Sequence, residues 1–302
     1  MALTFRPIAG PDELDLFLSL PYTLNDEIPD DLAGGRRRTG WMWVALDEGR
    51  LVARVAWWSR AGAAEPHLMD ILDFVVGGDA AAEELVRTAL AAVGGTPPEY
   101  MRFVPAGWRD DPGDVEARMA VLGRLGARPL VERRNMEWRR GAPLPAGSGR
   151  LKFRSFGGTG EALALLTAAL EGTLDAHSRA DLRRHAAGDV AAAHLHGELA
   201  RYPSPRDWWR VATLPGGDPV GFVFPARNDY GLIIAYIGVL PGHRGRGYID
   251  DVLAEGTRVL AAQPPGAAPR IRATTDVTNV PMAEAFLRAG YVNYRNEVTM
   301  VW

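Results

Sequence analysis

The fold of this chain can be worked out from one segment, Ile233-Ile-Ala-Tyr-Ile-Gly-Val-Leu-Pro-Gly-His-Arg-Gly-Arg-Gly-Tyr-Ile-Asp-Asp-Val-Leu253. It begins inside an apolar run, residues 232–240, whose isoleucines and valines predict a buried strand. Pro241-Gly242 ends that strand, and a glycine-rich basic loop, His243–Gly247, follows it. From Tyr248 to Ala262 the apolar residues recur at helical spacing. The predicted order is therefore strand, basic loop, helix.

The loop between this strand and this helix has the features of an anion site. The first backbone amides of a helix have no intrahelical acceptor, and the helix dipole is positive at that end. Gly245 and Gly247 carry no side chain that would hold a ligand away from the backbone. Arg244 and Arg246 add positive charge suited to phosphate oxygens. We predict that the loop binds a pyrophosphate; the alternative is a solvated basic turn.

The loop resembles the acyl-coenzyme A pyrophosphate loop of the GNAT N-acyltransferase superfamily, whose pattern is Gln/Arg-x-x-Gly-x-Gly/Ala. Arg244 matches the first position and Gly247 the fourth, whereas Ile249 stands where the family has Gly or Ala. A second block, Asn279-x-x-Met282-x-x-x-Phe286-x-x-x-Gly290-Tyr291, is similar to a downstream signature of the same superfamily. Two blocks in the right order are more specific than one glycine motif.

Composition narrows the class of protein. The chain has 302 residues, which favours two domains, and it is 47% hydrophobic, enough for a sizeable core. Its net charge of −3 argues against a nucleic-acid partner bound through bulk charge. It has no cysteine, so a disulfide framework, a thiolate metal site and a cysteine nucleophile are excluded. No apolar run reaches the ~20 residues of a membrane span, and no signal region follows Met1. We expect a cytoplasmic protein with no membrane partner.

Internal similarity predicts two copies of one fold, in a first domain of residues 1–147 and a second of residues 148–302. The chain from Leu122 to Trp138 tracks the chain from Phe286 to Trp302, with a constant offset of 164 between Gly126 and Gly290 and between Trp138 and Trp302. Residues 3–10 also match 151–158, and residues 41–45 match 208–212. A linker rich in proline and glycine, residues 141–149, lies between the copies.

Each copy is predicted to be an α/β (α+β) domain, a mixed, mainly antiparallel central sheet flanked by helices. In the first copy the strands are expected at residues 5–8, 40–46, 51–58, 69–76, 100–104 and 130–138, and the helices at 11–20, 80–93 and 114–125. The second copy carries about nineteen additional residues, because the offset between copies grows from 148 to 167. This added region is expected to be helical, over residues 161–174, from a capping box at Ser178 onward, and over 190–202.

The first copy lacks the basic loop. Residues 74–79 run directly into the helix without an arginine, and Asp79, Glu83 and Glu84 place negative charge where a pyrophosphate needs positive charge. We expect the first domain to be degenerate, without a cofactor loop, and to help form the acceptor cleft.

The resemblance implies that an acetyl group moves from acetyl-CoA, the cosubstrate, to the amine of a small molecule, by direct transfer in a ternary complex. It implies backbone donors on the strand of the quoted stretch, at Ile237, Gly238 and Val239. The same resemblance extends the cofactor-binding set to His243, Arg244, Gly245, Arg246, Gly247, Tyr248, Ile249, Asn279 and Phe286.

The catalytic residues are less clear, because Phe286 stands where the family often has a tyrosine that protonates the leaving thiolate. Water, or another tyrosine such as Tyr291, Tyr294 or Tyr248, could replace it. Tyr236 is the one ionisable side chain on the predicted strand, and it is a catalytic candidate.

Asp276 is the candidate base or amine anchor, with a helix cap as the alternative role. Asn279 has the same two interpretations. Asp250 and Asp251 fit dipole stabilisation or contact with an amine. His177 and His185 could act as a base, but they fit solvated helix positions better. His194 and His196 are two residues apart and so point to different sides of a helix, which argues against a metal site.

Three functions remain open from the sequence. The first is the N-acetyltransferase, acting as a monomer or homodimer on a small-molecule amine. The second is a non-catalytic acyl-CoA-binding sensor or scaffold, favoured by Phe286 and by the absence of acidic residues on the strand before the loop. The third is a nucleotide-binding protein.

Overall fold

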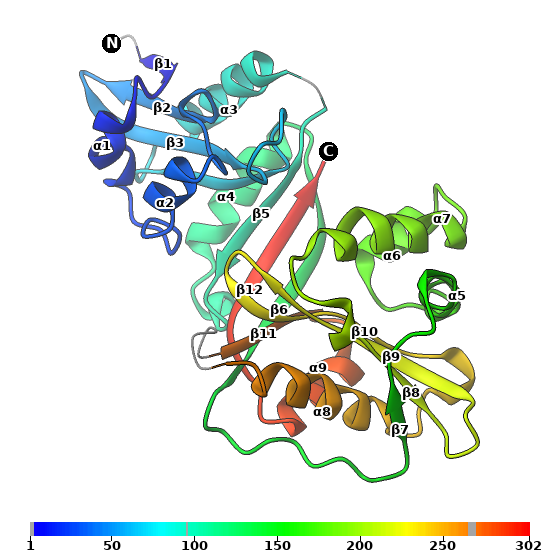
Figure 1. The fold of residues 1–302 in the computed structure, drawn as a ribbon. Helices are drawn as coiled ribbons and strands as arrows, with labels where there is room; N and C mark the ends of the chain where they lie inside the picture. Colours follow the sequence, from blue (N-terminus) through cyan, green and yellow to red (C-terminus); the bar gives the residue numbers. More distant parts are fainter. Residues whose placement is uncertain (1–2, 95, 265–269) are drawn as a thin grey trace. The chain divides into compact units, whose positions relative to one another are not determined.

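The computed structural model describes residues 3–94, 96–264 and 270–302. Contacts divide the chain into two compact units (Figure 1). Unit 1 is Met1–Val131 with Glu297–Trp302, and unit 2 is Glu132–Asn296. The chain passes between them inside two strands, β6 (Arg128–Arg139) and β12 (Val292–Val301). The two units are defined by the contacts within each of them. The predicted division of the sequence into two copies at residue 147 is a different boundary and stays a prediction.

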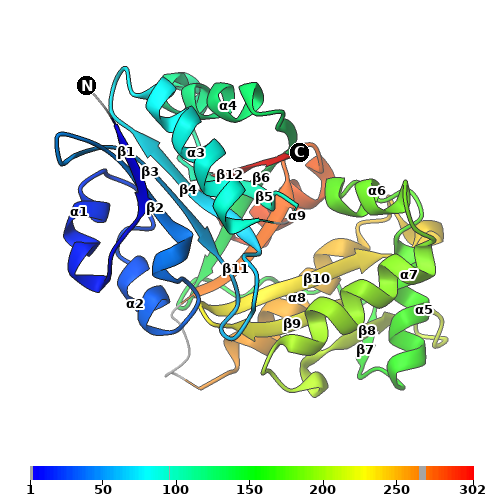
Figure 2. The same ribbon diagram turned by 90° about the horizontal axis from the view of Figure 1, so that it is seen from above.

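Unit 1 is built on five strands in the order β1-β2-β3-β4-β5, with the end of β12 next to β5. All neighbours among these five strands are antiparallel except β4 and β5, which are parallel. Helices α3 and α4 pack on one face through Leu85, Val86 and Val121, whereas α1 and α2 pack on the other through Phe17 and Ile28 (Figure 2). The bounds are β1 (Thr4–Pro7), α1 (Leu14–Leu18), α2 (Ile28–Ala33), β2 (Met42–Asp47), β3 (Arg50–Trp58), β4 (Leu68–Phe74), α3 (Asp79–Val93), β5 (Glu99–Val104) and α4 (Gly113–Arg124).

Unit 2 repeats this order as β7-β8-β9-β10-β11, with β6 beside β11. The parallel pair is again the fourth and fifth strands, β10 and β11. Helices α8 and α9 bury an apolar face against the sheet, and α5 and α7 bury theirs in a separate core with Phe222 and Phe224. The bounds are β7 (Lys152–Arg154), α5 (Thr159–Ala169), α6 (Ala176–Leu182), α7 (Ala187–Ala192), β8 (Arg210–Thr213), β9 (Pro219–Asn228), β10 (Gly231–Val239), α8 (Tyr248–Ala261), β11 (Arg270–Asp276) and α9 (Val280–Arg288).

The predicted fold class is confirmed, because both units contain a mixed, mainly antiparallel sheet flanked by helices. The strands of the first copy were placed to within about two residues at each end. Hydrophobic runs bounded by glycine turns identify such strands well, since burial and turn chemistry agree there.

The added helical region was predicted less well. The helix expected from Ser178 begins at Ala176, and its cap is Asp175, whose side chain accepts a hydrogen bond from the Ser178 amide at 2.7 Å. The capping box at Ser178 was therefore wrong. The helix expected over residues 161–174 ends at Ala169, and the one expected over 190–202 is three short pieces, α7, a π-helical turn (Ala193–Glu198) and a 3₁₀ turn (Leu199–Arg201).

The helix expected at residues 11–20 is also shorter. A 3₁₀ turn, Pro11–Glu13, precedes α1, which ends at Leu18. Asn25 accounts for the early end, since its side-chain amide donates to the carbonyls of Leu18 and Leu20 at 3.0 and 2.9 Å.

Candidate functional site

The central feature of unit 2 is a gap between β10 and β11. The two strands pair at only two positions, Leu232 with Ile271 and Ile233 with Arg272. A bulge follows in β10 between Ile234 and Tyr236, and beyond it residues 235–239 are only half-buried although they lie on a central strand. The edge of β10 that would face β11 is therefore open to a ligand in its second half.

Two backbone amides of β10 point into this gap. The Leu240 amide donates to the Val220 carbonyl of β9 at 2.8 Å. Because successive amides of a strand alternate in direction, the Gly238 amide also points to β9, whereas those of Ile237 and Val239 point the other way. Of the three predicted donors, Ile237 and Val239 are thus placed for a ligand. Gly238 instead leaves room for packing, since an added Cβ would lie 3.4 Å from the Phe222 ring.

The loop after β10 has the conformation of an anion site. A 3₁₀ turn, Pro241–His243, leads to Gly245 and Gly247, whose φ angles of 75° and 73° are left-handed. Only glycine adopts this conformation at no steric cost. Gly247 is the N-cap of α8 and provides no side-chain cap. In the part of the chain that the structure describes, the amides of residues 246–249 have no acceptor. They are free to bind an anion.

Arg244 is held by backbone carbonyls. Its guanidinium donates to Val239 at 3.0 Å, to Ala169 at 2.8 Å and to Glu171 at 2.6 Å. The last two carbonyls belong to the end of α5 and the turn after it, so Arg244 ties that helix to the end of β10. Its side chain orders the loop, and Arg246 is exposed, as Arg244 is.

The linker contributes two residues that the sequence did not single out. Ser148 donates through its hydroxyl to the buried Asp251 at 2.7 Å, and its amide bonds the same carboxylate. Arg150 donates to the Arg246 carbonyl at 2.9 Å, and its guanidinium lies 4.8 Å from the Tyr248 ring centroid. Asp251 therefore fastens the linker to the loop and is not free to hold an amine.

The other acidic residue of that turn, Asp250, is paired with Arg288 at 2.8 Å. Its position in the first turn of α8 also suits the helix dipole. Exposed pairs of this kind contribute little to stability.

Asp276 lies at the end of β11 and is buried, with 2% of its surface exposed. One carboxylate oxygen accepts from Arg133 at 2.8 Å, and the other accepts from the Ala176 amide at 2.7 Å. Arg133 also reaches Asp175 at 2.6 Å, so two carboxylates share one guanidinium. Since both oxygens of Asp276 already hold donors, the carboxylate is placed to fix the start of α6. The cap of α9 is Asn279, which accepts from the Met282 amide at 3.4 Å.

We expect Asp276→Ala to destabilise the protein by about 3 kcal/mol, because it removes two charge-assisted or buried hydrogen bonds and leaves the Ala176 amide without an acceptor. Urea unfolding measures the change. Asp189→Ala, at an exposed position in the first turn of α7, is the matched control and should cost less than about 1 kcal/mol. Equal stability of the two variants would contradict the structural role.

Tyr236 follows the bulge of β10 directly. Its ring stacks on Phe222, with centroids 5.9 Å apart, and meets His194 edge-on at 5.5 Å. Burial raises the pKa of Tyr236 to about 12, and the carboxylates of Asp175 and Glu198 act in the same direction. The phenol is therefore neutral at physiological pH, and a neutral phenol beside the open strand edge can donate a proton but not accept one.

Of the other candidate tyrosines, Tyr291 has its hydroxyl engaged in the core, whereas Tyr248 and Tyr294 have guanidiniums against their rings. The Tyr291 hydroxyl lies 2.8 Å from the Thr257 hydroxyl in the core, and burial raises its pKa. Tyr294 is flanked by the guanidinium of Arg272 at 5.6 Å. Phe286 is buried against Tyr291, with ring centroids 5.1 Å apart. His243 in the loop has a buried Nδ1 without a partner among the described residues.

The corresponding gap in unit 1 is filled with arginine side chains. β4 and β5 also pair at only two positions, Leu68 with Glu99 and Met69 with Tyr100. The Leu72 carbonyl of β4, however, accepts from Arg118 at 2.8 Å and from Arg102 at 3.4 Å. Both guanidiniums also bind Asp73, at 3.1 and 3.0 Å. By the offset of 164 that relates the two copies, Met282 stands where unit 1 has Arg118.

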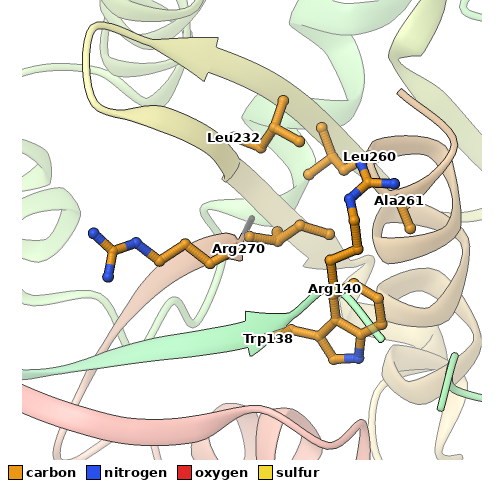
Figure 3. Close-up of a pocket in the computed structure, with 7 residues that line it drawn as sticks. Trp138, Arg140, Leu232, Leu260, Ala261 and Arg270 are labelled. Atoms are coloured by element: carbon orange, nitrogen blue, oxygen red, sulfur yellow. The ribbon is translucent and has the colours of Figure 1, made fainter. Parts of the chain in front are cut away.

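One small hollow lies elsewhere in unit 2 (Figure 3). It lies between the first residues of β10 and the end of α8, it is lined by Trp138, Leu232 and Leu260, and its cavity volume is about 0 Å³. Pockets for small molecules are usually about 300 Å³ or more. It is at the opposite end of β10 from the loop, so we do not regard it as the site.

Comparison with known proteins identifies the fold. No family model and no curated protein matches the sequence. Among solved structures, a GCN5-related N-acetyltransferase from Sphaerobacter thermophilus superimposes with a TM-score of 0.59 at 14% identity, over 99% of this chain and 94% of that one. A tandem GNAT protein from the clavulanic acid biosynthesis pathway, solved without AcCoA, gives 0.51 at 17% identity over 99% and 98%. A GCN5-related N-acetyltransferase from Kribbella flavida gives 0.52 at 15% identity, over 91% and 93%.

The chain therefore has the GNAT fold along its whole length, in a tandem arrangement. This confirms, for the fold, the resemblance found in the sequence. Within the described ranges, no helix is long and apolar enough to cross a membrane, and no group of acidic, histidine or cysteine residues is arranged to hold a metal ion.

Proposed function

We propose that this protein is an N-acetyltransferase that moves an acetyl group from acetyl-CoA to the amine of a small molecule, with its working site in unit 2. One contrast carries the proposal. Among the described residues, unit 2 leaves the first amides of α8 without acceptors and pairs β10 with β11 at two positions, whereas in unit 1 Arg102 and Arg118 lie in the corresponding gap and bind the Leu72 carbonyl.

The residues present fit an acyl-coenzyme A. A pyrophosphate needs several converging donors, and the bare amides of residues 246–249 provide them at the positive end of a fourteen-residue helix. Arg246 adds a guanidinium, and Gly245 and Gly247 let the ligand approach the backbone. The amides of Ile237 and Val239 offer pairing to an extended arm along β10, as a neighbouring strand would.

The chain's own residues can support acyl transfer in several ways. The Ile237 and Val239 amides are placed to stabilise the negative charge that develops on a thioester oxygen. The neutral phenol of Tyr236 can give a proton to a leaving thiolate, the role that Phe286 cannot fill. Because the sequence has no cysteine to form an acyl-enzyme, direct attack by the amine in a ternary complex is the simplest route.

Isothermal titration calorimetry with acetyl-CoA tests binding, and release of free thiol over a panel of primary amines tests turnover. We expect one binding site per chain and thiol release with at least one amine. No binding would refute the proposal. Binding without turnover on any amine would instead support the sensor or scaffold reading, and competition by ATP but not by coenzyme A would support a nucleotide-binding protein.

The remaining expectations stay predictions. They are a cytoplasmic location, no nucleic-acid or membrane partner, and a monomer or homodimer. The mild net charge of −3 is the observation behind the exclusion of nucleic acid.

A further inference from the structure

An unusual histidine lies next to Tyr236. His194 belongs to the π-helical turn Ala193–Glu198, and single π turns within helices occur often at functional sites. Its ring meets the Tyr236 ring edge-on, with the ring centroids 5.5 Å apart. Tyr236 directly precedes Ile237, whose amide faces the gap. The added helical segment thus brings an imidazole against Tyr236, on the part of β10 that follows its pairing with β11.

The two ring nitrogens of His194 have different surroundings. Nδ1 lies 3.8 Å from a carboxylate oxygen of Glu198, one turn further along the chain. The other oxygen of Glu198 accepts from the Tyr202 hydroxyl at 3.1 Å, which helps to fix the carboxylate. Nε2 is buried and has no hydrogen-bond partner among the described residues. A buried polar atom without a partner costs free energy, so this nitrogen has the capacity to bind a hydrogen atom of a ligand.

The two carboxylates next to the start of α6 are already paired. Asp276 holds Arg133 and the Ala176 amide, and Asp175 holds Arg133 and the Ser178 amide. Although burial would raise the pKa of Asp175, Arg133 and the Ser178 amide keep it below its ordinary value. His185 and His196 are exposed. An alkylamine, with a pKa of about 10, needs a base before it can attack.

We propose that His194 Nε2 is the general base that deprotonates the acceptor amine, and that Glu198 is a positioning residue that keeps the proton of the neutral ring on Nδ1. This inference rests on the proposed function. One proton of the substrate ammonium moves to Nε2, and the freed nitrogen lone pair forms the C–N bond to the thioester carbon. The C–S bond breaks with its electron pair on sulfur, a second amine proton goes to the sulfur, and His194 returns its proton to solvent.

The first test needs no acceptor. Long-range ¹H–¹⁵N spectra of the histidine rings, recorded in mildly alkaline buffer and assigned with His194→Gln, report which nitrogen carries the proton. We expect the Nδ1–H form with a bare Nε2, and a mixture of forms in Glu198→Gln. An Nε2–H form of His194 in the wild-type chain would overturn the proposal.

The second test is kinetic, on whichever amine of the panel is acetylated fastest. His194→Gln should lower kcat about 100-fold or more, with the affinity for acetyl-CoA unchanged by calorimetry. Glu198→Gln should lower kcat about 10-fold. His196→Gln, two residues away on the exposed side, is the matched control and should behave as wild type.

The outcomes separate the two proposals. Wild-type turnover in His194→Gln overturns the role of His194 while the proposed function stands. Acetyl-CoA binding by the wild-type chain without turnover on any amine overturns the proposed function. Failure of the wild-type chain to bind acetyl-CoA overturns the proposed function itself.

Discussion

Gly247→Asp should weaken acetyl-CoA binding by about 100-fold or more while leaving the protein folded. The substitution places a carboxylate at the N-cap of α8, beside the amides proposed to hold the pyrophosphate. Two unit charges about 5 Å apart repel by about 3 kcal/mol at an effective dielectric constant of 20, which corresponds to about 100-fold in affinity. Isothermal titration calorimetry gives the affinity, and thermal unfolding shows whether the fold is intact.

The matched control is Gly247→Asn. Asparagine has nearly the shape of aspartate, and both residues tolerate the left-handed conformation at φ 73° better than other side chains do. An added Cβ would meet only Arg150 Nη2, at 3.6 Å, so space allows either residue. The two substitutions therefore share the cost in backbone strain and bulk, and the difference in affinity between them isolates the charge.

A second control tests the contrast between the units. Gly77→Asp changes a glycine of similar φ, 76°, in the loop after β4 of unit 1, where an added Cβ has open space. It should leave acetyl-CoA binding unchanged. If Gly77→Asp weakened acetyl-CoA binding as much as Gly247→Asp does, the claim that only unit 2 binds acetyl-CoA would be contradicted. If Gly247→Asp bound acetyl-CoA as tightly as the wild type does, the loop His243–Gly247 would not be part of the binding site.

Asp73→Ala should destabilise unit 1 by about 3–5 kcal/mol, the range found when one partner of a buried ion pair is removed. Asp73 is 1% exposed and binds three guanidiniums, those of Arg54 at 2.8 Å, Arg102 at 3.0 Å and Arg118 at 3.1 Å. Without the carboxylate, three buried guanidiniums lie close together, and Asp114, whose side chain is 66% exposed, is left to pair with Arg102 and Arg118. Urea unfolding followed by tryptophan fluorescence should show an early transition.

Asp79→Ala is the control for this measurement. Asp79 also belongs to unit 1 and also pairs with an arginine, Arg124 at 3.3 Å, but its side chain is 54% exposed. Exposed pairs contribute about 0–1 kcal/mol, so this variant should stay close to wild type. If Asp73→Ala were equally mild, the arginine-filled gap would not be a stabilising feature of unit 1.

The Gly247→Asp and Asp73→Ala experiments both test how each unit satisfies the gap between its fourth and fifth strands. A gap between the fourth and fifth strands exists in each unit, and each unit must satisfy the backbone groups that the gap exposes. Unit 1 satisfies the Leu72 carbonyl with its own arginines. Unit 2 leaves amides that a ligand can satisfy, which is the physical basis of the proposed division of labour.

Much of the fold could be predicted from local pattern. The strand and the helix on either side of His243–Gly247 were placed to within a residue, because an apolar run, a Pro-Gly stop and a helical repeat agree there. The left-handed glycines of the loop follow from the same logic, since no other residue suits that backbone as well. The similarity between residues 122–138 and residues 286–302, at an offset of 164, predicted a repeated fold.

The candidate site could be predicted only in part. Which atoms Arg244 binds depends on the end of α5, more than seventy residues earlier in the chain. The Asp276 carboxylate accepts hydrogen bonds from Arg133 and from the Ala176 amide, and no local sequence pattern predicts that these residues lie near it. The spacing of His194 and His196 argues only against a metal site, and the same spacing allows one of the two to face β10.

The sequence by itself determined the strand–loop–helix unit, the conformation of its glycines and the repetition of the fold, because these depend on neighbours along the chain. Only the tertiary structure decided which charges form pairs and which polar atoms stay without a partner. Hydrogen bonds between distant residues fix those choices, and their partners are set by packing, which spacing along the sequence does not encode.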